Sequence, residues 1–256
     1  MRAQDVEPVF HGLLTDDTHD QQLAHMVGVE FVAGLQPAAF LYGGLEIHCA
    51  GGFGVDVSLE RLAQIFIEQQ SRGAANIELV TPTHYIDPII DALTLAKSRG
   101  LTLPVVWNSN GYELTSTLDR LNGLVDIYLP DLKYFQSELS NEYSKAKDYF
   151  EQAVSSIREM VKIAGKPEYD DNGIMKKGVI IRHLVLPGSR HDSIRLMDII
   201  GQEFKNDEIL ISLMSQFTPN EHCKGIKNLS RRTTTFEYQS VVKAIEKYGF
   251  ETDLKI

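Results

Sequence analysis

Short runs of apolar residues alternate along this chain with stretches in which apolar positions recur at helical spacing. Short apolar runs bounded by turn residues are typical of buried strands, whereas a period near 3.6 indicates a helix that packs by one face. Buried strands are predicted at residues 77–80, 105–107, 125–129, 179–186 and 209–214. Helices are predicted at residues 88–98, 115–121, 149–163, 192–204 and 236–248, and a further helix between the N-cap residue Ser58 and Gly73.

The alternation of these strands and helices predicts an α/β fold. Strands that are apolar throughout, each followed by a helix, favour parallel pairing with right-handed crossovers. With a weak first strand at residues 29–33, about six βα units are expected, which is fewer than the eight of a closed barrel. We therefore expect a partial, open parallel βα barrel in one large domain, since 256 residues with 43% hydrophobic content can bury a sizeable core.

Charge and hydropathy narrow the function classes. A formal net charge of -10 argues against nucleic acid as a partner, because nucleic-acid-binding proteins usually carry a basic patch. The sequence has no run of 18 or more apolar residues and no basic segment followed by an apolar one near its first residue. The expectation is a cytoplasmic protein without a membrane partner.

Polar segments stand where the predicted strands end. Residues 81–84 read Thr-Pro-Thr-His, residues 108–111 read Asn-Ser-Asn-Gly, and Asp131 and Lys133 follow the strand at 125–129. Arg182 and His183 interrupt the apolar strand at 179–186, and because neighbours alternate, one must face the outer helices. We predict that Arg182 faces inward. Parallel barrels carry their functional groups at these strand ends.

In order and spacing, these segments resemble the radical S-adenosylmethionine (SAM) proteins of the pyruvate formate-lyase activating enzyme type, from about residue 45 to residue 248. The segment at 81–85 resembles an uncharacterised branch of activating-enzyme homologues. The resemblance implies a radical SAM-like barrel with SAM and a 4Fe-4S cluster as cofactors. It also implies reductive cleavage of SAM and hydrogen abstraction from a partner, which in the best-known members is a protein substrate of the glycyl radical enzyme type.

The resemblance also implies which residues bind the cofactor. Residues 81–84 stand where the family often has a Gly-Gly-Glu segment for the SAM amino group, and residues 108–111 resemble an Asp-Thr-Asn-Gly turn. The Asp-x-Lys pair contacts a cation and the methionine moiety in the family. Arg182, if it faces inward, can reach a carboxylate or the ribose of a bound nucleoside. The implied cofactor-binding residues are Thr83, His84, Asn108, Ser109, Asn110, Asp131, Lys133 and Arg182.

Structural interpretations of the same residues stay open. Thr83 and His84 can cap the following helix, and residues 108–111 can form an ordinary turn because Asn, Ser and Gly are turn formers. Arg182 can form a salt bridge with a neighbouring strand, for example to Asp131. Taken alone, an Asp-x-Lys pair is usually a surface ion pair of small energetic value.

The cluster ligands are missing from the sequence. The family holds its cluster on a C-x-x-x-C-x-x-C loop, whereas this chain has two cysteines, Cys49 and Cys223. Counting back without a gap from residues 45–47 places Leu35, Ala39 and Tyr42 at the three cysteine positions, and deletion of the loop is the alternative. Neither provides the thiolates that a cluster needs. Residues 1–44 are therefore an atypical segment, residues 45–256 form the barrel, and no metal ligands are assigned.

Three functions follow from different classes. The first is an activating-enzyme-like radical SAM protein whose activity is impaired by the missing cysteines. The second is a pseudo-enzyme that binds SAM or a partner without redox chemistry. The third is a truncated, non-functional remnant. The missing thiolates favour the second and third over the first.

Overall fold

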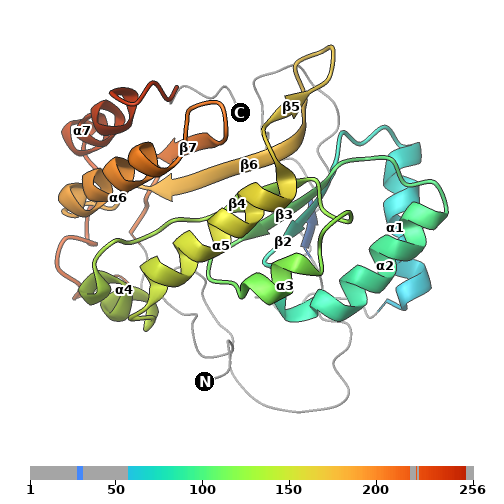
Figure 1. Cartoon of the computed structure of the whole chain (residues 1–256). Helices are drawn as coiled ribbons and strands as arrows, with labels where there is room; N and C mark the ends of the chain where they lie inside the picture. Colours follow the sequence, from blue (N-terminus) through green and yellow to red (C-terminus); the bar gives the residue numbers. More distant parts are fainter. Residues whose placement is uncertain (1–27, 31–56, 220–222, 224, 252–256) are drawn as a thin grey trace.

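The computed structural model of this protein describes residues 28–30, 57–219, 223 and 225–251, the first three by their backbone alone (Figure 1). Within this part, seven strands form a sheet of order β1-β2-β3-β4-β6-β5, and β7 also pairs with β6. The strands are β1 (Gly28–Glu30), β2 (Ile77–Val80), β3 (Val105–Ser109), β4 (Ile127–Pro130), β5 (Glu168–Tyr169), β6 (Met175–Leu184) and β7 (Leu210–Met214). The fold is α/β and is consistent with a partial βα barrel.

Helices follow the parallel strands, as the sequence predicts. They are α1 (Leu59–Ser71), the short 3-10 helix η3 (Pro82–Tyr85), α2 (Ile86–Ser98), α3 (Thr115–Asp119), α4 (Ser137–Ser144), α5 (Tyr149–Ala164), α6 (Arg190–Glu203) and α7 (Thr235–Glu246). The predicted N-cap of α1 is confirmed, because the Ser58 side chain accepts a hydrogen bond from the backbone N–H of Arg61. The polar helix α4 was not predicted, since its sequence offers few apolar positions from which a helical period can be read.

Five strands of the sheet, β2, β3, β4, β6 and β7, run parallel to one another. The predicted strand at 77–80 is confirmed residue for residue. The predicted strand at 179–186 instead begins at Met175 and ends at Leu184. It begins earlier because its first residues pair with β5 in an antiparallel hairpin, which the polar residues there gave no reason to expect.

The prediction for the first strand was wrong in direction. Strand β1 pairs antiparallel with β2, with Val29 opposite Leu79, so it opens no βα unit, and the described sheet has five parallel strands where six were expected. An antiparallel edge strand needs no crossover helix, so the counting of βα units does not apply to it. Residues 31–33 of the predicted strand and the boundary at residue 44 lie outside the described residues.

The described helices and the sheet share one hydrophobic core. Trp107 of β3 and Tyr128 of β4 are fully buried in it, together with residues from the packed faces of five helices: Phe66 (α1), Ile89 (α2), Ile157 (α5), Leu196 (α6) and Val241 (α7). Figure 1 shows α5 along this face, where it contacts β4 and β6. Helices on one face of a parallel sheet fit a barrel wall better than a doubly wound sheet, which is covered on both faces.

The opposite face of the sheet carries a second, smaller apolar cluster of Val106, Ile127, Leu129 and Ile180. These side chains alternate with the helix-facing ones along their strands, as the pleat requires. The residues two positions further along the same strands, among them Asn108 and Arg182, therefore lie on this inner face at the carboxyl ends of the strands.

Candidate functional site

Asp131 and Arg182 form an ion pair at the carboxyl ends of β4 and β6. Arg182 Nη2 lies 2.7 Å from Asp131 Oδ1, and the two backbones form an isolated parallel bridge. Lys133 Nζ lies 3.7 Å from Asp131 Oδ2, so two cations flank one carboxylate. About a quarter of each side chain stays accessible: 26% for Arg182, 24% for Lys133 and 21% for Asp131. The salt-bridge interpretation of Arg182 is therefore confirmed, and accessibility leaves these groups able to contact a ligand as well.

The predicted orientation of the Arg182 and His183 pair is confirmed. His183 is 1% exposed and faces α6, where its Nε2 lies 2.8 Å from Ser193 Oγ, while its Nδ1 lies 2.6 Å from the Leu132 carbonyl oxygen. A carbonyl oxygen can only accept, so Nδ1 carries the proton and donates it. Burial lowers the pKa of His183, the neutral ring dominates, and Nε2 accepts from the Ser193 hydroxyl.

Asn108 contacts a carboxylate that the strand-end motifs did not reveal. Its Nδ2 donates to Glu78 Oε1 over 2.7 Å, and both side chains are buried. Glu78 alternates with the helix-facing residues Ile77 and Leu79 of β2, so it lies on the inner face with Asn108. The signal was present in the sequence, since an acidic residue in the middle of a short buried strand requires a polar partner.

Thr83 and Ser109 lie on the other side of the sheet, around the buried carboxylate of Glu113. Thr83 Oγ1 donates to Glu113 Oε1 over 2.6 Å, Ser109 Oγ donates to Oε2 over 3.1 Å, and Trp107 Nε1 donates over 2.9 Å. Burial raises the pKa of Glu113, and the three donors oppose that shift. The Thr83 hydroxyl therefore bonds Glu113 and caps no helix. The cofactor role of Thr83 and Ser109 stays a prediction.

His84, the neighbour of Thr83 in η3, is exposed. The cap position of α2 is Tyr85, which makes no side-chain cap hydrogen bond. The capping interpretation of Thr83 and His84 is therefore wrong for both residues. A cofactor contact of His84 remains a prediction.

The turn at residues 108–111 packs against the end of the next strand. Asn110 Oδ1 accepts the backbone N–H of Tyr112 over 2.9 Å, which is an Asx turn. Gly111 has a φ of +77°, and a Cβ atom there would lie 2.2 Å from the Asp131 carbonyl oxygen. The glycine is thus required for the close approach of this turn to the backbone of Asp131.

The donor set of the chain does not fit a family-type iron–sulfur cluster. Such a loop needs three thiolates, and the sequence supplies two cysteines in all. Cys223 is buried in the core at 1% exposure. Cys49 and the candidate ligand positions Leu35, Ala39 and Tyr42 lie outside the described residues. Among the residues that the structure describes, no group of three or more His, Cys, Asp or Glu is placed to hold a metal ion.

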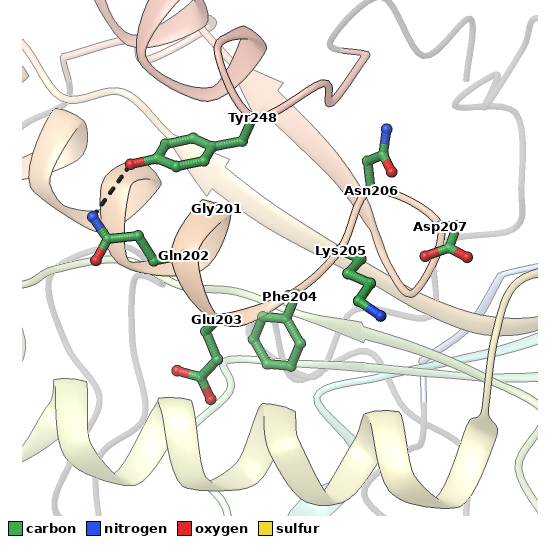
Figure 2. A pocket seen from close by; sticks show the side chains of 8 residues that line it. All are labelled: Gly201, Gln202, Glu203, Phe204, Lys205, Asn206, Asp207 and Tyr248. Atoms are coloured by element: carbon green, nitrogen blue, oxygen red, sulfur yellow. Dashed lines mark hydrogen bonds between the residues drawn. The ribbon is translucent and has the colours of Figure 1, made fainter.

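A surface hollow of about 600 Å³ lies at the end of α6 and is lined by residues 201–207 and by Tyr248 (Figure 2). Gln202 Nε2 donates to the Tyr248 hydroxyl over 3.3 Å across it. Residues 204–209 lead into the amino end of β7. The hollow therefore lies at the amino ends of the parallel strands, whereas Asp131 lies at their carboxyl ends. It brings no predicted site residue together, and we assign it no function.

The fold and the strand-end residues define an α/β protein with a partial-barrel sheet and an ionic cluster at the carboxyl ends of its strands. No family model matches the chain. The Uncharacterized protein MJ0674 of Methanocaldococcus jannaschii is 29% identical over 171 residues, which is 66% of this chain and 45% of that protein. The crystal structure of SuiB from Streptococcus suis matches with a TM-score of 0.50 and 12% identity, over 77% of this chain and 44% of SuiB.

The match to SuiB supports the fold, and neither comparison shows an activity for this chain. The chain spans less than half the length of both proteins. At 12% identity, the likeness to SuiB concerns the fold alone. No helix in the described part of the chain is long and apolar enough to cross a membrane.

Proposed function

We propose that this chain is a radical SAM-like protein of the activating-enzyme lineage that binds SAM at the inner strand ends around Asp131, without a cluster held on its own loop of three thiolates. The order of the strand-end motifs supports the lineage, and the likeness to SuiB, a radical SAM-type protein, supports the fold. The observation that carries the proposal is the accessible ionic cluster of Asp131, Lys133 and Arg182.

The charges of this cluster suit a zwitterionic ligand. Two cations around one carboxylate leave a net positive charge, which favours the carboxylate of an amino-acid moiety, while Asp131 favours its ammonium group. Arg182 uses Nη2 for Asp131, and its Nε has no hydrogen-bond partner within the described structure. The Nε atom is itself buried, so a ligand would meet the accessible part of the Arg182 side chain and not Nε.

Neighbouring polar groups extend the cluster across the inner face. Ser212 of β7 pairs in register with Arg182, and Asn108 of β3 lies in register with Leu129, two residues before Asp131. These side chains supply hydroxyl and amide groups to which ribose and adenine can hydrogen-bond. The proposal therefore concerns binding of SAM and includes no reductive cleavage. A partner polypeptide of the glycyl radical enzyme type is a further proposal, which rests on the family resemblance.

Calorimetric titration of SAM into the iron-free protein tests the proposal. Asp131→Asn keeps the shape of the side chain and removes its charge, so we expect affinity to fall about tenfold, the equivalent of about 1.4 kcal/mol. Asp207→Asn is the matched control, because it breaks an Asp–Lys pair with Lys166 near the amino ends of the strands, away from the proposed site. No binding to the wild-type protein would favour a remnant, and equal affinities of wild type and Asp131→Asn would place the site elsewhere.

A further inference from the structure

The buried hydroxyl of Tyr149 hydrogen-bonds both polar segments of the proposed site, the turn at residues 108–111 and the Asp-x-Lys segment after β4. Tyr149 is the first residue of α5, and its ring is 2% exposed. Its oxygen lies 2.9 Å from the carbonyl oxygen of Asn110 and 2.9 Å from that of Asp131. It also accepts the backbone N–H of Lys133 over 3.1 Å. One hydroxyl thus contacts the turn after β3 and both ends of the Asp-x-Lys segment after β4.

The ring of Tyr149 is held on two sides by aromatic neighbours. Tyr112 stacks on it with ring centroids 6.2 Å apart and an interplanar angle of 8°, and Tyr134 meets it edge-on at 5.5 Å. Both neighbours belong to the segments that the hydroxyl joins, because Tyr112 follows the turn after β3 and Tyr134 follows Lys133. Ring and hydroxyl therefore constrain the same pair of segments.

The Tyr149 hydroxyl uses both its proton and a lone pair for these contacts. A phenol has one proton to donate, so the carbonyl groups of Asn110 and Asp131 share it, and a lone pair accepts the Lys133 N–H. Burial, and then the negative charge of Asp131, raise the pKa of Tyr149, so the proton is retained at physiological pH. The close contact of Gly111 with the Asp131 carbonyl leaves little space for the turn to shift.

We propose that Tyr149 is a positioning residue for this site: it sets the spacing between the turn at residues 108–111 and the Asp-x-Lys segment, and thereby aims the Asp131 and Lys133 side chains at the ligand. The inference rests on the proposed function for its ligand. Its structural part, that the hydroxyl fixes the backbone at Lys133, is independent of any ligand.

Tyr149→Phe removes the hydroxyl and keeps the ring contacts. Tyr134→Phe is the matched control, because Tyr134 is equally buried and its hydroxyl bonds Ser144 of α4 at 3.1 Å, away from the two turns. Each variant is titrated with SAM well below its melting temperature. We expect about tenfold weaker SAM binding for Tyr149→Phe and unchanged binding for Tyr134→Phe. The melting temperature should fall in both variants, because each loses a buried hydrogen bond.

Amide hydrogen exchange without ligand provides the second measurement. The Lys133 amide loses protection in Tyr149→Phe and keeps it in Tyr134→Phe if the hydroxyl fixes this segment. Unchanged exchange at Lys133, or SAM affinities that fall equally in both variants, would overturn the inference. If wild-type protein binds no SAM, the proposed function fails, and the exchange result alone then decides whether Tyr149 fixes the segment.

Discussion

Thr83 and Glu113 follow neighbouring strands, 30 residues apart, and the Thr83 hydroxyl donates to the Glu113 carboxylate over 2.6 Å. Trp107 and Ser109 donate to the same carboxylate from β3. The loops after β2 and β3 are therefore tied together on the helix side of the sheet, while Asp131 and Arg182 are paired on the inner side. The buried carboxylate of Glu113 thus stabilises the part of the sheet that carries the proposed site.

Replacing Glu113 by alanine leaves the donors of Thr83, Trp107 and Ser109 without their acceptor. We expect a loss of about 3 kcal/mol in unfolding free energy, measured by urea denaturation, because buried donors then lack partners. Glu159→Ala is the control, since its carboxylate pairs with the largely exposed Lys162, and it should cost under about 1 kcal/mol. Equal losses would show that the Glu113 cluster contributes little to stability.

The raised pKa of Glu113 gives a pH signature. Between about 4.5 and its folded-state pKa, the folded protein binds more protons than the unfolded chain, so this contribution to stability is present at low pH and lost as pH rises. Glu113→Gln does not titrate. The unfolding free energy of Glu113→Gln relative to wild type should therefore increase as pH rises through this window. A difference that is constant with pH would contradict the burial of this carboxylate.

His183 should produce the opposite dependence. Burial lowers its pKa, so below about pH 6.5 the unfolded chain binds the proton more readily, and stability is lost as pH falls. His183→Asn should show a weaker loss of unfolding free energy between pH 7.5 and 5.5 than wild type. Identical curves for wild type and His183→Asn would exclude this role of His183.

Gly111 and Gly123 form a matched pair of left-handed glycines, with φ values of +77° and +78°. A Cβ at Gly123 meets nothing within 4 Å, whereas one at Gly111 would lie 2.2 Å from the Asp131 carbonyl oxygen. Gly123→Ala should cost about 1 kcal/mol from backbone strain alone, and Gly111→Ala about 3 kcal/mol or more. Equal losses of unfolding free energy for the two variants in urea denaturation would show that the turn does not lie in close contact with the Asp131 carbonyl.

The sequence predicted most elements of the described fold, because hydrophobic periodicity reports which face of an element is buried. The strand at 77–80 and the inward orientation of Arg182 follow from that rule and are confirmed. The partners of polar residues are set by tertiary contacts, which local patterns do not contain. Thr83 was therefore not linked to Glu113, and the direction of β1 was wrong because edge pairing leaves no periodic signal.

Cysteine substitution tests the register inferred for residues before position 45. Leu35→Cys, Ala39→Cys and Tyr42→Cys together recreate a C-x-x-x-C-x-x-C loop, and three thiolates leave one iron open for SAM. We expect the triple variant to take up iron on anaerobic reconstitution and the wild type to form no stable 4Fe-4S cluster, as measured by iron and sulfide analysis. A triple variant that binds no more iron than wild type would show that this segment is foreign to the barrel.

A map of backbone amide chemical shifts during titration of the iron-free protein with SAM shows directly whether SAM binds around Asp131. The amide groups of Asp131, Leu132, Lys133 and Arg182 lie at the proposed site, so their resonances should shift with a common saturation curve. The amide resonances around Tyr248, which lies near the amino end of β7, should keep their chemical shifts. Shifts confined to the hollow beside Tyr248, or no shifts at high SAM concentration, would show that SAM does not bind around Asp131.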